Sequence, residues 1–196
     1  MRSQETGWQP LESRVEYHNP HLSVEKVRIA TPTRPRGAEW MVVRRKKGCV
    51  VAPLTTDGRF VLIREERIPV QATVWEFPAG QVDGDGPLHE TMLRENALRE
   101  LREESGYELG PEGELIPLGF YYPSFGFTDE TTYLFLAKGV VPSPKGVAYD
   151  ENEAILGCRT VTPGELRAMI ANGELVDANS LAIYGRLVAL NLFPPG

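Results

Sequence analysis

The chain has 196 residues, of which 41% are hydrophobic, enough to bury the core of one domain with a small appendage. Its net charge of −6, without a basic stripe, argues against a partner with a nucleic acid backbone. No apolar run is long enough to span a bilayer and the start lacks a signal-peptide core, so we expect no membrane partner. Cys49 and Cys158 have neither metal-ligand spacing nor the pattern of a disulfide framework, which favours a reduced, cytoplasmic setting.

The first forty-odd residues predict short strands. Residues 13–31 alternate polar and apolar side chains, and residues 39–45 (EWMVVRR) follow a loop rich in proline and arginine. We expect these strands to form a small antiparallel sheet. Because a lone small sheet tends to need a partner, residues 1–46 are expected to serve as a dimerisation element of a homodimer, and residues 47–196 to form a second domain.

Residues 48–67 have the form of a β-hairpin, in which two β-branched runs are joined by a turn at residues 56–58 (TDG). After a loop, residues 74–77 (VWEF) continue the sheet. The following residues 78–80 (PAG) break it, because proline cannot donate to a strand ladder and glycine favours a turn.

A helix is predicted from Pro87 to Ser105, where apolar residues recur at spacings of one, three and four and Gly106 follows as a C-cap. Further strands are expected at residues 114–122, 131–140 and 154–162. Helices are expected at residues 163–173 and 178–193, the first beginning with a proline in its first turn. Strands flanked by separate helices predict a mixed α/β sandwich.

The long helix carries three carboxylates on one face. Glu100, Glu103 and Glu104 stand at i, i+3 and i+4, where like charges destabilise an isolated helix by a few tenths of a kcal/mol per pair. A solvated acidic surface is one interpretation. The other is a site for a hard divalent cation such as Mg²⁺ or Mn²⁺, which prefers oxygen ligands and supports phosphoryl chemistry.

The residues from Arg99 to Tyr107 (RELREESGY) resemble the second half of the Nudix box, GX5EX7REUXEEXGU, at every fixed position. The preceding residues 78–80 (PAG) resemble the strand end that leads into that box. The chain is identified as a member of the Nudix family, which implies an α/β/α sandwich with a mixed sheet in residues 47–196.

One departure from the box concerns its first half. Gly80 precedes Arg99 by nineteen residues, whereas the pattern has fourteen, so five residues are inserted around residues 83–90 (DGDGPLHE). The first glutamate of the box would fall at Thr91, and we assign no residue to it.

The resemblance narrows to Nudix enzymes similar to ADP-ribose pyrophosphatases, in which a proline follows the box by about sixteen residues, as Pro123 follows Tyr107 here. Residues 62–80 and 150–184 are similar to the same subfamily, so the resemblance covers roughly residues 40–190. It implies hydrolysis of the pyrophosphate of ADP-ribose to AMP and ribose 5-phosphate. The alternatives are another nucleoside diphosphate sugar, such as ADP-glucose or GDP-mannose, and a module that binds a nucleotide sugar without cleaving it.

The resemblance also implies roles for the metal and the catalytic residues. Mg²⁺ or Mn²⁺ would be the cofactor, and Arg99 would orient the carboxylates. The expected metal ligands are the backbone carbonyl of Ala79, Glu100 and Glu104, with Glu103 as a further ligand or a base. The expected general base is Glu151, with Glu103 and Glu153 as alternatives.

The remaining expected roles concern the small-molecule substrate. Arg67 would grip its phosphates in a bidentate way, although an ordinary surface arginine at a strand end has the same pattern. Glu76 is expected to be a buried partner of an arginine. Further substrate-binding candidates, each with core, interface or turn packing as its alternative, are Pro123, Phe125 and Trp40.

Overall fold

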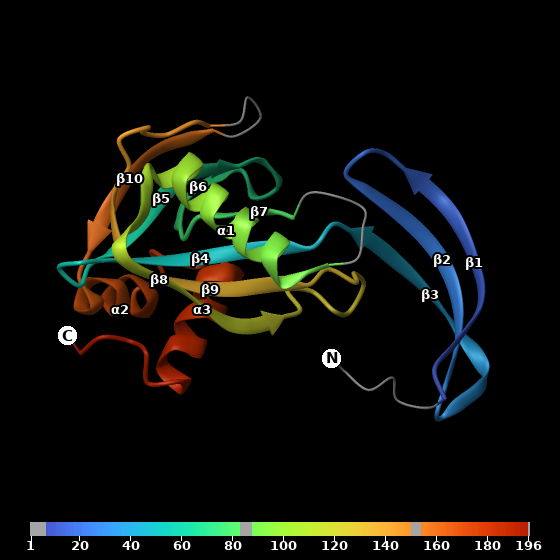
Figure 1. Cartoon of the computed structure of the whole chain (residues 1–196). Coiled ribbons are helices and arrows are strands. Elements are labelled where there is room, and N and C mark those ends of the chain that lie inside the picture. The colour runs from blue at the N-terminus through green and yellow to red at the C-terminus, as the bar shows by residue number, and fades with distance from the viewer. Residues whose placement is uncertain (1–6, 83–87, 150–153, 196) are drawn as a thin grey trace. The chain divides into compact units, whose positions relative to one another are not determined.

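The computed structural model describes residues 7–82, 88–149 and 154–195 (Figure 1). The chain divides into two compact units. The first holds the residues up to Lys46 together with Tyr122–Thr131, and the second holds Lys47–Tyr121 and the residues from Thr132 onward. Within the described ranges no helix is long and apolar enough to cross a membrane. Cys49 is a buried free thiol and Cys158 an exposed one.

The first unit is built on a three-stranded antiparallel sheet in the order β1-β2-β3. Its connection from β1 to β2 is held by Asn19, whose side-chain oxygen accepts from the backbone N–H groups of His21 and Leu22 at 2.8 and 2.9 Å. The predicted separate N-terminal sheet is thereby confirmed. Its strands are β1 (Gln9–His18), β2 (Leu22–Thr31) and β3 (Arg34–Arg45).

The segment Tyr122–Thr131 joins the first unit through the outer edge of β3. The backbone N–H of Val43 donates to the carbonyl of Phe127 at 2.8 Å. The indole N–H of Trp40 donates to the carbonyl of Gly126 at 2.9 Å. Arg44 pairs with Asp129 at 3.3 Å. The chain therefore returns to its N-terminal sheet between two strands of the second unit, which the sequence pattern did not predict.

The second unit contains a seven-stranded mixed sheet with the path β10-β5-β4-β9-β8, to which β6 adds on β5 and β7 on β4. β4 and β9 run parallel, and the other neighbouring pairs run antiparallel. The predicted hairpin forms, with Gly58 at φ +80° in its turn. The strands are β4 (Gly48–Thr55), β5 (Phe60–Arg67), β6 (Ala72–Glu76), β7 (Ala79–Gln81), β8 (Tyr107–Tyr121), β9 (Thr132–Pro142) and β10 (Ile155–Val161).

Helices cover both faces of this sheet (Figure 1). On β4, Val50 and Ala52 face the core under α2 (Pro163–Ala171) and α3 (Ala178–Ala189), whereas Cys49 and Val51 face the core under α1 (Glu90–Ser105). β4 is buried on both sides because alternate residues of a strand point to opposite faces. The predicted α/β/α sandwich with a mixed sheet is confirmed.

The helix ends follow the expected capping chemistry. α1 ends at Gly106, whose φ of +71° is the left-handed conformation of a C-cap. α2 begins at a capping box in which Thr162 and Glu165 each satisfy the other's backbone N–H. α3 ends at Ala189, four residues before Phe193, because that ring turns back to stack on Phe60 with centroids 5.4 Å apart.

α1 also packs against β7 through a contact that only glycine permits. A Cβ built on Gly80 would overlap the carboxyl group of Glu100. The backbone N–H of Ala79 donates to Oε2 of Glu104 at 2.8 Å. One turn of α1 is therefore fixed on the backbone of β7 by shape and by a hydrogen bond.

We expect Gly80→Ala to reduce the free energy of unfolding by about 1–3 kcal/mol, because either β7 or the Glu100 side chain must move. Urea unfolding monitored by circular dichroism measures this loss. Gly157→Ala in β10 is the matched control, since a Cβ there meets no atom within 4 Å. Equal losses in the two variants would contradict the close packing of α1 on β7.

Candidate active site

Glu100 and Glu104 lie one turn apart on α1 and are almost completely buried, with 4% and 1% of their surface exposed. The apolar residues Ala97 and Leu101 anchor the same helix in the core above β4. This anchoring directs the two carboxylates toward the backbone of β7. Burial of an ionised carboxylate is costly unless it is paired or coordinates a cation, so this pair distinguishes α1 from an ordinary acidic surface helix.

Glu103 differs from the other two carboxylates. Its side chain is 25% exposed, and it accepts from Nη1 of Arg99 at 3.0 Å and from Nη2 of Arg102 at 2.5 Å. Arg99 also donates through Nη2 to Oε1 of Glu100 at 2.7 Å. Arg99 therefore holds Glu100 and Glu103 together and offsets the repulsion that three like charges on one helix face create.

The thiol of Cys49 lies beneath these carboxylates and is 1% exposed. Burial, reinforced by the charge of Glu100, raises its pKa to about 12. The thiol therefore stays protonated at neutral pH. It packs as a small apolar group beneath the acidic face.

Glu100, Glu104 and the backbone of Ala79 offer oxygen ligands of the kind that Mg²⁺ and Mn²⁺ prefer. In the described part of the chain, no three His, Cys, Asp or Glu side chains form a complete metal-binding group. The two buried carboxylates would supply only part of the ligands of such a cation, which commonly keeps water and substrate ligands. The predicted bases Glu151 and Glu153 lie outside the described residues.

A second acidic cluster surrounds Arg67 at the end of β5. Nε of Arg67 donates to Oε2 of Glu76 at 3.3 Å, and Nη2 forms ion pairs with Oε1 of Glu76 at 2.7 Å and with Oε2 of Glu65 at 3.1 Å. Glu76 is therefore the buried partner of an arginine, as expected. Burial alone lowers the pKa of Arg67, but the charges of Glu76 and Glu65 outweigh it and raise the pKa overall.

The pKa of Glu76 rises to about 8. Burial is the largest cause and the neighbouring carboxyl of Glu65 the next, while the charge of Arg67 opposes both. Asp177, the N-cap of α3, adds a further negative charge and accepts from the backbone N–H of Ser180 at 2.9 Å. Burial also raises the pKa of Asp177. Glu65 and Asp177 were not predicted from the sequence to be parts of a site.

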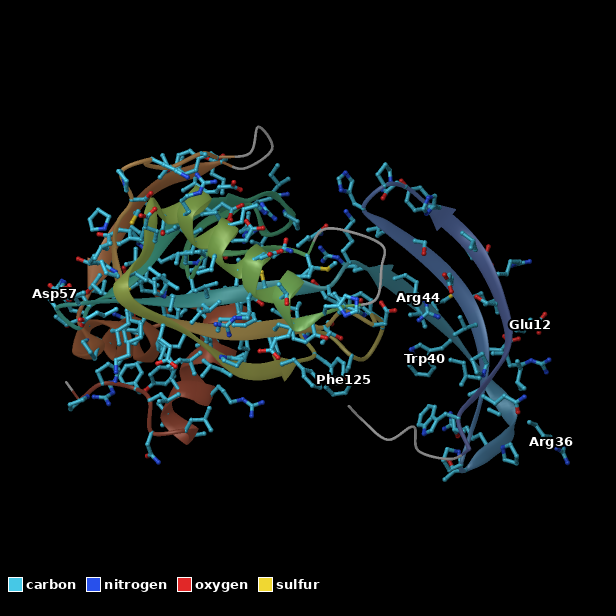
Figure 2. All side chains as sticks on the ribbon, viewed as in Figure 1. Glu12, Arg36, Trp40, Arg44, Asp57 and Phe125 are labelled. Atoms are coloured by element: carbon cyan, nitrogen blue, oxygen red, sulfur yellow. The ribbon has the colours of Figure 1, made fainter. Side chains whose placement is uncertain are left out.

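The aromatic candidates belong to the first unit, whereas Arg67 and the three glutamates of α1 belong to the second. Trp40 on β3 is 56% exposed, and Phe125 in the returning segment is 82% exposed. Figure 2 labels Trp40 on β3 and Phe125 in the segment Tyr122–Thr131. Pro123 lies half-buried in the same segment as Phe125. All three roles in substrate binding stay predictions.

Comparison with known proteins identifies the family. Residues 44–182 match the NUDIX domain. The chain is 31% identical over 135 residues to the methanol dehydrogenase activator of Bacillus methanolicus, covering 67% of this chain and 68% of that protein. It is 29% identical over 140 residues to the ADP-ribose pyrophosphatase of Bacillus subtilis, covering 71% and 70%, and 31% identical over 147 residues to that of Mycobacterium tuberculosis, covering 74% and 66%.

The fold agrees with this assignment. A crystal structure of an ADP compounds hydrolase matches with a TM-score of 0.73 and covers 96% of both chains at 16% sequence identity, a likeness that concerns the fold alone. The extent of the domain match and the identity to curated relatives decide the family. The chain therefore belongs to the Nudix hydrolase family and is similar to its ADP-ribose pyrophosphatases.

Proposed function

We propose that this chain hydrolyses the pyrophosphate bond of ADP-ribose to AMP and ribose 5-phosphate in a reaction that depends on Mg²⁺ or Mn²⁺. The observation that carries the proposal is the buried pair Glu100 and Glu104, held against the backbone of Ala79 and Gly80. Two relatives of about 30% identity are ADP-ribose pyrophosphatases, which supports ADP-ribose as the substrate.

Glu100, Glu104 and the carbonyl of Ala79 would hold the divalent cation, with Glu103 as a further ligand. When bound, the cation supplies a Lewis acid that polarises the phosphate oxygens and lowers the pKa of the attacking water. Arg99 keeps Glu100 in place through its 2.7 Å hydrogen bond, so this carboxylate needs little reorganisation before it binds a cation.

Substrate binding would use Arg67 for the phosphates. Its contacts engage Nε and Nη2, and Nη1 has no hydrogen-bond or ion-pair partner in the described part of the chain. The side chain is 38% exposed, and a phosphate oxygen would bind at this nitrogen. Trp40 and Phe125 expose flat rings that suit stacking on an adenine, and Pro123 would shape the segment that carries Phe125.

Glu151 would act as the general base that takes the proton of the attacking water, with Glu103 and Glu153 as alternatives. A positioned carboxylate base contributes roughly a hundred- to ten-thousandfold to the rate. A reduced, cytoplasmic location suits the two free thiols and remains an expectation.

We also propose a homodimer formed through the N-terminal sheet. β1 is exposed along its whole length and is an edge strand of the first unit. Val15 and Tyr17 on this strand are 58% and 55% exposed. An exposed strand edge with apolar side chains is suited to pairing with a second copy of the chain.

The release of AMP from ADP-ribose in the presence of Mg²⁺ tests the activity. We expect Glu104→Gln to lower kcat by more than about a hundredfold, since even the loss of an outer-shell partner costs ten- to a hundredfold. Glu95→Gln is the matched control, because Glu95 lies on α1 with its side chain exposed. Activity retained in the Glu104 variant would contradict the metal-binding role.

Parallel hydrolysis assays with ADP-ribose, ADP-glucose and GDP-mannose identify the substrate. Turnover of another sugar nucleotide but not of ADP-ribose would leave the metal-binding role of α1 standing. It would overturn ADP-ribose as the substrate. Binding of all three nucleotide sugars without turnover of any would favour the non-catalytic module.

The molar mass of the protein, measured by light scattering as it elutes from a size-exclusion column, tests the proposed dimer. We expect a mass near twice the 21.8 kDa of one chain, and a monomer for the double variant Val15→Lys, Tyr17→Lys, because two buried ammonium groups would oppose pairing. Val188→Lys is the control, since Val188 is 46% exposed on α3. A monomeric wild-type protein would refute the proposal.

A further inference from the structure

Glu65 and Glu76 form a buried pair of carboxyl groups on neighbouring strands, the acid pair. β5 and β6 pair with Ile63 opposite Glu76 and Glu65 opposite Val74, so the two glutamates are diagonal neighbours on one face of the sheet. Only 6% of Glu65 and 3% of Glu76 is exposed. Water therefore solvates neither carboxyl group well.

Both carboxyl groups contact the same guanidinium. Arg67 reaches Glu76 through Nε and Nη2 and reaches Glu65 through Nη2, with distances between 2.7 and 3.3 Å. These contacts of Nε and Nη2 fix the plane of the guanidinium. They therefore determine the direction in which Nη1 is presented to a ligand.

The charges of this cluster do not balance if both acids are ionised. Two carboxylates against one guanidinium leave one excess negative charge, and Asp177 adds to the negative potential from the N-terminus of α3. Arg67 is the only cation that contacts the acid pair among the described residues. A net negative cluster would repel a pyrophosphate, and an unbalanced buried charge is costly. A single shared proton makes the acid pair and Arg67 neutral together, which lessens both difficulties.

We propose that Glu65 and Glu76 share one proton, and that this proton keeps the Arg67 cluster electrically neutral so that Arg67 can bind the pyrophosphate of the substrate. The inference rests on the proposed role of Arg67. The two glutamates are positioning residues, since they act on the substrate through Arg67.

The direction of the pKa shift at Glu76 agrees with this arrangement. Burial and the neighbouring Glu65 raise its pKa to about 8, while the charge of Arg67 opposes both. Below that pH the cluster is neutral and substrate affinity is constant. As the pH rises through the pKa of Glu76, the acid pair loses its proton and the cluster around Arg67 becomes negative. The pyrophosphate then binds more weakly. The chemical step is affected less, because neither glutamate touches the reacting atoms.

The dependence of KM and kcat on pH tests the proposal with ADP-ribose as the probe. In the wild type we expect KM to rise about tenfold between pH 7 and pH 9, because only the protonated pair binds well. Glu76→Gln should remove this rise and keep a low KM, because the amide stays neutral and still accepts from Arg67. Glu76→Ala should raise KM roughly tenfold or more at every pH, since it removes the charge-assisted contacts of Glu76 with Arg67.

Glu66→Gln is the matched control, because Glu66 is the next residue on β5 and its side chain is exposed. It should keep the wild-type pH profile. A rise in KM that persists in Glu76→Gln, or a KM at pH 7 as high as that of Glu76→Ala, would overturn the proposal.

Carboxyl ¹³C resonances of glutamate-labelled protein provide a readout that needs no substrate. We expect one resonance titrating near pH 8 in the wild type and in Glu66→Gln, and none in Glu76→Gln. If that resonance is present but ADP-ribose is not cleaved, the proposed function fails while the shared proton stands. If ADP-ribose is cleaved and no carboxyl titrates near that pH, the shared proton is refuted.

Discussion

The contact between α1 and the short strand β7 sets the geometry of the candidate active site. It places two buried carboxylates, Glu100 and Glu104, against a backbone that has no side chain at Gly80 and a donating N–H at Ala79. Burial of two like charges is unfavourable unless partners offset it. The structure supplies Arg99 and a backbone N–H, and the proposed cation would offset the remaining negative charge.

The cluster around Arg67 solves a related electrostatic problem in a different way. There one guanidinium faces two buried carboxyl groups, and the imbalance is removed by a proton instead of a metal. Arg67 and α1 are electrostatically coupled, because the charge of Glu104 contributes to the raised pKa of Arg67. An acidic chain can therefore attract a pyrophosphate only where cations, bound or built in, outweigh its carboxylates.

Much of this arrangement could be predicted from the sequence, because local rules decide it. The apolar spacing of α1 and the cap at Gly106 predicted the acidic helix. The predicted break of the sheet at residues 78–80 was wrong for Ala79 and Gly80, because these residues leave β6 and pair with β4 as β7. The return of Tyr122–Thr131 to the first unit could not be predicted, because it depends on non-local bonds such as that from Trp40 to Gly126. Glu65 was missed, although it lies on the same face of β5 as the buried residues Val61 and Ile63.

The first measurement to make is the binding of Mn²⁺ in the absence of substrate. It tests whether Glu100 and Glu104 hold a divalent cation, apart from any effect on the chemical step. Electron paramagnetic resonance of the free ion gives the dissociation constant for the wild type and for variants at Glu100, Glu104 and the exposed Glu95. We expect Mn²⁺ to bind to the wild type and to Glu95→Gln, and to bind at least about tenfold more weakly to Glu100→Gln and to Glu104→Gln. Equal affinity in all four proteins would show that the buried carboxylates do not hold the metal.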